Sequence, residues 1–189
     1  FYYVALAVAS AFVGPPMTAD AWEGFALNTL AFTLVTVAIL GRLWCSAFIA
    51  GHKEEELITG GPYALCRHPL YGLSVLGGLG LGIATHTVVL TVVTLIVLTL
   101  LLASDARREE ARIEARHGEA YRAYKRVTPR WLPHLRQARQ ALPRRVQVPP
   151  DVYWKAFLDA GSFALLYLLI VTMTTLRETG LSPTLLHVP

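Results

Sequence analysis

The sequence predicts an all-α protein, a polytopic membrane bundle of about five transmembrane helices, and three observations carry that prediction. Hydrophobic residues make up 54% of the 189 residues and charged residues only 16%, whereas charged residues make up about a quarter of a typical soluble domain. The apolar residues are gathered into long segments separated by polar stretches. The basic residues are concentrated in some of those stretches and absent from others, as is usual for loops on the two sides of a membrane.

Five apolar segments are expected to form helices, and they cover residues 1–13, 25–50, 70–84, 87–103 and 152–176. The first is shorter than the about 20 residues that a spanning helix needs. Either the numbered sequence begins inside that helix, or the helix is unusually short. Only Thr85 and His86 separate the third segment from the fourth, so we expect a tight antiparallel helical hairpin there.

The third apolar segment is rich in glycine, with Gly72, Gly77, Gly78, Gly80 and Gly82. Glycine weakens a helix in water, but in lipid it lets two helices approach closely. We therefore predict close helix packing along this segment. A phosphate-binding glycine loop is not indicated, because the run lies inside an apolar helix rather than after a strand.

A charged cytoplasmic amphipathic helix is predicted to follow the fourth apolar segment, over residues 104–127. Ser104 is a suitable N-cap residue. Glu119 and Arg122 lie at helical neighbour spacing, where opposite charges attract. Gly118 should weaken or bend this helix.

The chain is predicted to divide into a membrane core over residues 1–133, a basic connector over residues 134–150 and an additional C-terminal transmembrane helix with its tail over residues 151–189. The connector is rich in Pro and Arg and should lie on the lipid headgroups. In the last helix Lys155 and Asp159 are one turn apart, so they can neutralise each other. This helix carries no functional motif, and it could dock a partner membrane protein.

The distribution of basic residues predicts how the chain is oriented. Of the 17 Lys and Arg residues, 12 lie between Asp105 and Pro150, and the polar stretch before the third apolar segment carries Lys53 and Arg67, whereas residues 14–24 have none. The positive-inside rule therefore puts both basic loops in the cytoplasm, with the N-terminus cytoplasmic and the C-terminus on the opposite side. Anionic lipid headgroups are the expected partners of these loops, rather than nucleic acid.

Short motifs flank the predicted hairpin: Gly61-Pro62-Tyr63 and Arg67-His68-Pro69-Leu70-Tyr71 precede it, and Glu109-Glu110, Gly118-Glu119-Ala120-Tyr121-Arg122-Ala123-Tyr124 and Pro129-Arg130-Trp131-Leu132-Pro133 follow it. In this order the motifs resemble those of the integral membrane methyltransferases of the isoprenylcysteine carboxyl methyltransferase and phospholipid N-methyltransferase group. The resemblance covers about half of the chain. It implies that S-adenosylmethionine is the methyl donor, and that a lipophilic acceptor enters from the bilayer. An isoprenylcysteine carboxylate, a phospholipid amine and a small hydrophobic molecule all remain open as acceptors.

The basic pair before the third segment is a candidate donor site. Arg67 and His68 stand beside Pro69, which suits the first position of a helix, so they can present a cation and a helix N-terminus to a carboxylate. The hairpin should bring Glu110 close to His68. A carboxylate there could bind the ribose hydroxyls or the ammonium of the donor, and the resemblance implies that Glu109 or Glu110 does so.

Four tyrosines are further candidates for donor binding: Tyr63, Tyr71, Tyr121 and Tyr124. Their rings could pack on adenine or stabilise the sulfonium by cation-π attraction. They could equally be aromatic residues settled at the membrane interface.

Arg42 lies eight residues from the end of its apolar run, and a charge inside a membrane is a functional candidate by default. Arg42, His68 and Glu110 are therefore the predicted catalytic residues. No metal site is predicted, because the histidines lack ligand spacing. Cys45 and Cys66 are expected to be unpaired thiols.

Two other functions stay open at this point. Sterol and enone reductases that use NADPH share a related hairpin and a His-Pro-x-Tyr signature, although they typically have Asn where this chain has Leu70. A catalytically silent family member that acts as a membrane assembly subunit is the second alternative. The presence of Arg67, His68 and both glutamates argues against that second reading.

Overall fold

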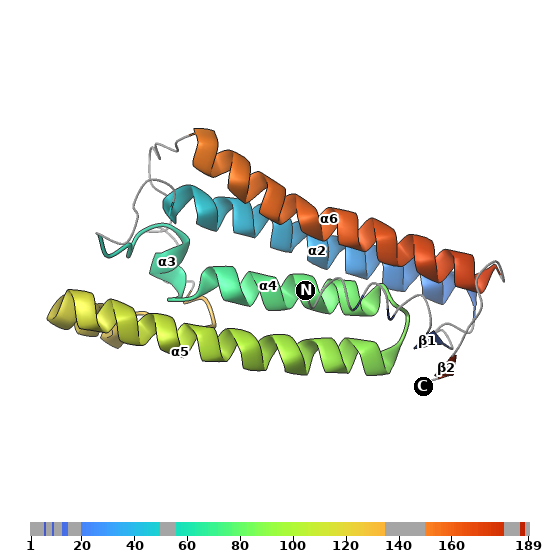
Figure 1. Cartoon of the computed structure of the whole chain (residues 1–189), viewed down its shortest axis with the longest axis horizontal. Coiled ribbons are helices and arrows are strands. Elements are labelled where there is room, and N and C mark those ends of the chain that lie inside the picture. Colours follow the sequence, from blue (N-terminus) through green and yellow to red (C-terminus); the bar gives the residue numbers. More distant parts are fainter. Residues whose placement is uncertain are drawn as a thin grey trace. The chain divides into compact units, whose positions relative to one another are not determined.

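The computed structural model describes residues 6, 9, 13–14, 20–49, 56–134, 150–179 and 186–187, and this part of the chain is dominated by helices (Figure 1). The helices are α2 (Ala21–Ile49), α3 (Pro62–Leu65), α4 (Pro69–Ile83), α5 (Val88–Val127) and α6 (Pro150–Glu178). Two strands of two residues each, β1 (Val13–Gly14) and β2 (Leu186–His187), pair in parallel. The predicted all-α class is thus confirmed.

Three helices among the described residues are long and apolar enough to cross a membrane: Trp22–Ile49, Val88–Val127 and Tyr153–Arg177. Many of their apolar side chains face outward, as lipid contact requires, and Leu100 is 65% exposed. The 15 residues of α4 span only about 22 Å, less than the about 30 Å of a hydrocarbon core. The predicted segment over residues 1–13 lies almost entirely outside the described residues, so the structure supports three of the five predicted spans within the part of the chain that it describes.

The chain forms two compact units. Unit 1 consists of residues 1–39, 75–99 and 160–189, and unit 2 consists of residues 40–74 and 100–159. Helices α2, α4, α5 and α6 each contribute residues to both units, whereas α3 belongs to unit 2 alone.

In unit 1, the glycine-rich part of α4 packs against three other helices. A Cβ atom added to Gly80 would lie 2.9 Å from the Ala31 carbonyl oxygen of α2, and one added to Gly82 would lie 2.9 Å from the Thr91 Cα atom of α5. A Cβ atom on Gly77 would meet the Phe163 ring of α6. Glycine is therefore needed for these contacts, and the predicted close packing is confirmed here.

The connection between α4 and α5 is a short turn. The Thr85 amide donates to the Gly82 carbonyl at 3.0 Å, and the His86 amide donates to the Ile83 carbonyl at 2.9 Å. His86 has a φ of 53°, and its ring nitrogen lies 3.1 Å from the Asn28 side-chain oxygen of α2. Arg177 of α6 donates to the Thr85 carbonyl. This hydrogen bond connects α6 to the turn between α4 and α5 within unit 1.

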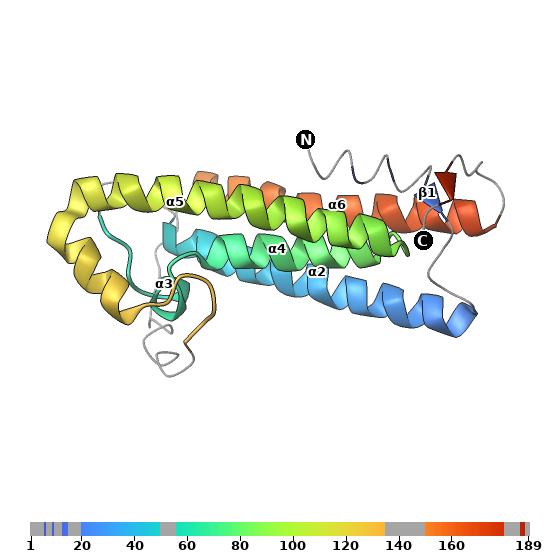
Figure 2. The same cartoon turned by 90° about the horizontal axis from the view of Figure 1, so that it is seen from below.

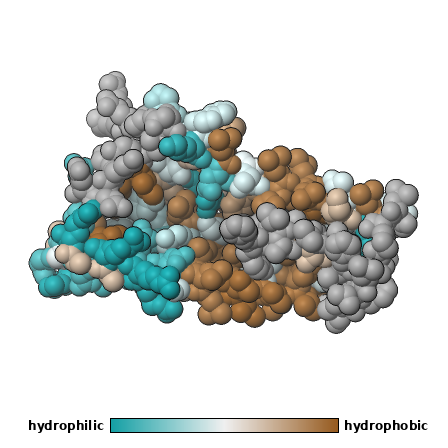
Figure 3. Space-filling model, viewed as in Figure 1, coloured by the Kyte–Doolittle hydropathy of each residue, from teal (hydrophilic) through white to brown (hydrophobic). Residues whose placement is uncertain are grey.

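Helix α5 differs from the prediction, because it continues through Ser104 instead of ending before it. The change from apolar to charged side chains at this point is a change of environment, and no Gly or Pro interrupts the backbone there. The part of α5 before Gly118, residues 88–117, spans about 45 Å, and the surface of α5 is hydrophobic over the first half and hydrophilic over the second (Figure 3). The predicted bend is found at Gly118, with φ 52° and ψ −119°, and Figure 2 shows a sharp turn within the later part of α5.

Candidate active site

A buried carboxylate, Glu110 of α5, is the centre of an ionic cluster in unit 2. Its Oε1 atom lies 3.1 Å from His68 Nε2 and 3.1 Å from Arg67 Nε. Arg130 adds a two-pronged contact, from Nε to Oε1 at 3.2 Å and from Nη2 to Oε2 at 2.9 Å. These four contacts use most of the acceptor capacity of one carboxylate. The structure therefore brings His68 and the acidic pair together. Glu110 is the hub of this cluster, because Arg67, His68 and Arg130 all bind its carboxylate.

Backbone pairing holds the basic residues at this hub. The Arg67 amide donates to the Pro129 carbonyl at 2.8 Å and the His68 amide donates to the Arg130 carbonyl at 3.2 Å. The His134 amide donates to the Leu65 carbonyl at 2.9 Å. The segment before α4 is thus paired with the segment that follows α5.

The Arg67 side chain also secures the end of α5. Its Nη1 atom donates to the carbonyls of Lys125 and Thr128, at 3.2 and 2.9 Å. Carbonyls at a helix C-terminus lack partners within the helix, and a guanidinium can satisfy them. Arg67 therefore connects Glu110 to the C-terminal end of the same helix.

His68 is almost fully buried, with 5% of its surface exposed. Its ring stacks on Tyr71 at 5.4 Å and lies 5.7 Å from the Trp131 ring. Its Nδ1 atom lies 3.6 Å from Glu109 Oε2. Burial lowers the pKa of His68 below its ordinary value, although the two neighbouring glutamates oppose that shift. The imidazole is therefore neutral at pH 7.

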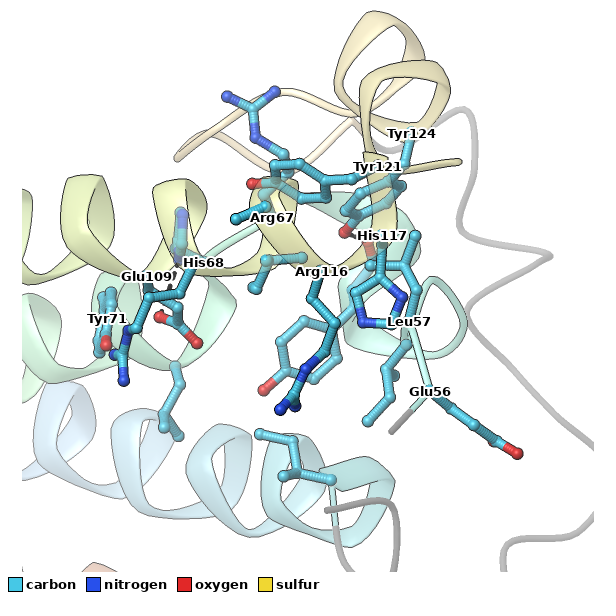
Figure 4. Close-up of a pocket in the computed structure, with 17 residues that line it drawn as sticks. Glu56, Leu57, Arg67, His68, Tyr71, Glu109, Arg116, His117, Tyr121 and Tyr124 are labelled. Carbon is cyan, nitrogen blue, oxygen red and sulfur yellow. Dashed lines mark hydrogen bonds and ion pairs between the residues drawn. The ribbon is translucent and has the colours of Figure 1, made fainter. Parts of the chain in front are cut away.

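A cavity of about 540 Å³ adjoins this cluster, within the about 300–1,000 Å³ typical of ligand pockets. Figure 4 shows its wall, where a dashed line joins His68 to Glu109. Seven of the predicted site residues line it: Tyr63, Arg67, His68, Tyr71, Glu109, Tyr121 and Tyr124.

Three predicted site residues are not part of the cavity lining in the described part of the chain: Arg42, Pro69 and Glu110. Pro69 is the first residue of α4, as predicted. Arg42 hydrogen-bonds to Ser74 and forms an ion pair with Asp159. Asp159 thus has Arg42 as an ion-pair partner, where the sequence suggested Lys155.

A tyrosine near the C-terminal end of α5, Tyr124, connects this helix to Tyr63 of α3. The Tyr124 hydroxyl donates to the Tyr63 carbonyl at 2.5 Å, and Tyr121 is only 2% exposed. Burial raises the pKa of Tyr63, so its hydroxyl stays protonated. Cys66 and Cys45 are both free, as predicted, and burial raises the pKa of Cys66 to about 11.

The sequence analysis missed several residues of the cavity wall, above all Arg112, Arg116 and His117 of α5. Figure 4 shows the Arg116 and His117 side chains among those drawn around the cavity, which Leu57 also lines. Counted from Glu109, these residues follow the spacing of one helix face, and that spacing could have identified them. In the described ranges, no group of three His, Cys, Asp or Glu side chains is arranged to hold a metal ion.

Part of the chain is similar to known proteins. Residues 40–120 match the phospholipid methyltransferase family. The chain is 38% identical, over 116 residues, to the nickel-cobalt-cadmium resistance protein NccN of Alcaligenes xylosoxydans xylosoxydans, covering 61% of this chain and 54% of the relative. It is 39% identical, over 118 residues, to the cobalt-zinc-cadmium resistance protein CzcN of Cupriavidus metallidurans, covering 60% of this chain and 54% of the relative.

The chain spans about half the length of the curated relatives it matches. No solved structure matches the chain significantly. The family match contains α4, its preceding basic pair and about the first four fifths of α5, which together hold His68, Glu109 and Glu110. Residues 40–120 are therefore the part of the chain that is similar to the phospholipid methyltransferase family.

Proposed function

We propose that this protein is an integral membrane methyltransferase that transfers a methyl group from S-adenosylmethionine to a lipophilic acceptor. The match of residues 40–120 to the phospholipid methyltransferase family supports the reaction class, and three apolar helices support the membrane location. One observation supports placing the reaction at this cavity: the ionic cluster around Glu110 holds His68 and Arg67 on the cavity wall.

The cavity offers suitable groups for each part of the donor. Glu109 would accept hydrogen bonds from the ribose hydroxyls or from the ammonium group, and Arg116 would attract the carboxylate. The rings of Tyr63 and Tyr121 would pack on the adenine or near the positive sulfur. When bound, S-adenosylmethionine supplies a methyl group made electrophilic by its sulfonium.

The remaining work of such a site is to hold the two reactants in line and to exclude water. Glu110 would serve this purpose by fixing the positions of Arg67, His68 and Arg130. Apolar side chains complete the wall, namely Ile49, Leu57, Ile58, Leu70 and Ile113. They would favour an acceptor with a lipophilic body.

The curated relatives are named as resistance proteins for nickel, cobalt, cadmium and zinc. We infer that this chain acts in a comparable setting, by methylating a lipophilic component of the membrane. The test of donor binding below does not depend on a role in metal resistance.

Donor binding is the direct test. Calorimetry on the detergent-purified chain should show that S-adenosylhomocysteine binds and raises the melting temperature, whereas NADPH does neither; at a ligand concentration of 100 Kd the expected stabilisation is about 2.7 kcal/mol. Glu109→Gln should weaken binding at least tenfold. Glu119→Gln is the matched control, because this glutamate is exposed and lies outside the cavity lining. Binding of NADPH in place of S-adenosylhomocysteine would instead support the reductase alternative.

A further inference from the structure

The imidazole of His68 lies between two carboxylates, one near each ring nitrogen. Nε2 is 3.1 Å from Glu110 Oε1, and Nδ1 is 3.6 Å from Glu109 Oε2. The two glutamates differ in their surroundings. The Glu110 side chain is 11% exposed and is bound by Arg67 and Arg130, whereas the Glu109 side chain is 38% exposed and lines the cavity.

This difference selects one tautomer of the neutral ring. Two guanidiniums keep Glu110 ionised, and an ionised carboxylate can only accept hydrogen bonds. The single N–H of a neutral imidazole is therefore best used at Nε2, where it donates to Glu110 at the shorter distance. Nδ1 is left as a lone pair that faces Glu109 on the cavity wall.

In this tautomer the Nδ1 lone pair and the Glu109 carboxylate are both hydrogen-bond acceptors, so no proton is shared between them. A proton delivered to Nδ1 would become a donor to Glu109, and the resulting imidazolium would lie between two negative charges. Burial of the ring opposes protonation beforehand, in line with the lowered pKa of His68. Arg130, which binds Glu110, also opposes protonation of the ring, and the rings of Tyr71 and Trp131 pack beside it.

We propose that His68 is the base that removes a proton from the methyl acceptor through Nδ1, with Glu110 as the residue that positions its ring. This inference rests on the proposed function and names the acceptor class: an amine or a thiol on a lipophilic body. A carboxylate acceptor is already ionised at neutral pH, so it would have no proton for His68 to take.

The step balances as follows. The N–H or S–H bond of the acceptor breaks, and its proton passes to Nδ1. The electron pair stays on nitrogen or sulfur and forms the new bond to the methyl carbon. The bond from that carbon to the donor sulfur breaks at the same time, and its electron pair neutralises the sulfonium.

Three probes of equal chain length separate the acceptor classes: dodecylamine, dodecanethiol and laurate. With radiolabelled S-adenosylmethionine and the detergent-purified chain, methyl transfer is expected to the amine or the thiol and not to laurate. Transfer to laurate alone, or to none of the three, would overturn the inference.

His68→Gln separates the base from the binding site. The Gln amide can still donate to Glu110, but it cannot accept a proton. We expect transfer to fall about 10²- to 10⁴-fold, while S-adenosylhomocysteine binding stays within threefold. In the parent chain the transfer rate should fall at acidic pH as His68 becomes protonated, and Glu119→Gln should change neither quantity. Transfer by His68→Gln within tenfold of the parent would overturn the role of this histidine.

Nitrogen-15 NMR of labelled histidine gives a readout without any reaction: at neutral pH His68 should carry its proton on Nε2. A proton on Nδ1 in the parent chain contradicts the inference. If the parent fails to bind S-adenosylhomocysteine, the proposed function fails and this inference falls with it. If the parent binds S-adenosylhomocysteine but the acceptor probes, His68→Gln or the NMR spectrum give the opposite of the expected result, only the inference about His68 is overturned.

Discussion

Unit 1 and unit 2 are held together by different physical means. Unit 1 depends on shape, since glycines of α4 allow backbone contacts that any Cβ atom would block. Unit 2 depends on charge, since one buried carboxylate joins two guanidiniums and an imidazole. Close packing needs only apolar surroundings, whereas an ionic cluster beside a cavity can bind and react. The difference explains why the candidate chemistry lies in unit 2.

Removal of the hub should have the largest effect. Glu110→Ala leaves Arg67, Arg130 and His68 without their shared carboxylate, and breaking a buried ion pair costs about 3–5 kcal/mol. We expect a large fall in the melting temperature together with loss of S-adenosylhomocysteine binding. Thermal unfolding and calorimetry in detergent measure the two effects. A variant that melts like the parent would show that charge does not hold unit 2 together.

A substitution in unit 1 should separate stability from binding. Gly80→Leu forces a side chain against the Ala31 carbonyl and the Val35 side chain, and overpacking costs about 1–3 kcal/mol. The melting temperature should fall, yet the folded protein should bind S-adenosylhomocysteine as the parent does. Gly161→Leu is the control, because a Cβ atom added there meets no atom within 4 Å apart from its chain neighbours and the nearby backbone of its own helix. Equal losses in both variants would contradict the packing argument.

The comparison also shows what the sequence could predict. The glycine contacts of α4 and the approach of His68 to Glu109 and Glu110 follow from the order of segments along the chain, and the structure confirms both. The distinction between the two glutamates could not be predicted as easily. Neighbouring residues on a helix point about 100° apart, so one faces the hub and the other the cavity, and only the position of the partners decides which.

Arg130 and Asp159 reveal the other limit of the sequence analysis. Arg130 reaches Glu110 because the chain bends at Gly118 and then pairs with residues 65–68. Asp159 pairs with Arg42 across 117 positions. No local pattern encodes either contact. The predicted helix start at Ser104 was wrong for the opposite reason, because the local change in polarity at this residue does not interrupt the helical backbone.

The pH dependence of stability should report the buried imidazole. Burial lowers the folded-state pKa of His68, so below its ordinary value of about 6.5 the unfolded chain binds this proton more readily than the folded chain. Stability should therefore decrease as the pH falls from about 6.5 to the folded-state pKa, by up to about 1.4 kcal/mol for each pH unit in that window. Melting curves between pH 7.5 and 5 should show this decrease in the parent. If His68→Gln loses stability with falling pH as steeply as the parent does, the decrease comes from other titratable groups.

The smallest effect is expected at the ion pair of Arg42 and Asp159. The Asp159 side chain is 61% exposed, and an ion pair with one exposed partner contributes about 1 kcal/mol or less. Asp159→Asn keeps a hydrogen-bond acceptor for Arg42, so the melting temperature should fall by only a few degrees. Binding of S-adenosylhomocysteine should not change, because neither residue lines the cavity in the described part of the chain. A tenfold loss of binding would mean that Arg42 acts on the site after all, and that charge in unit 2 connects the C-terminal helix to the reaction.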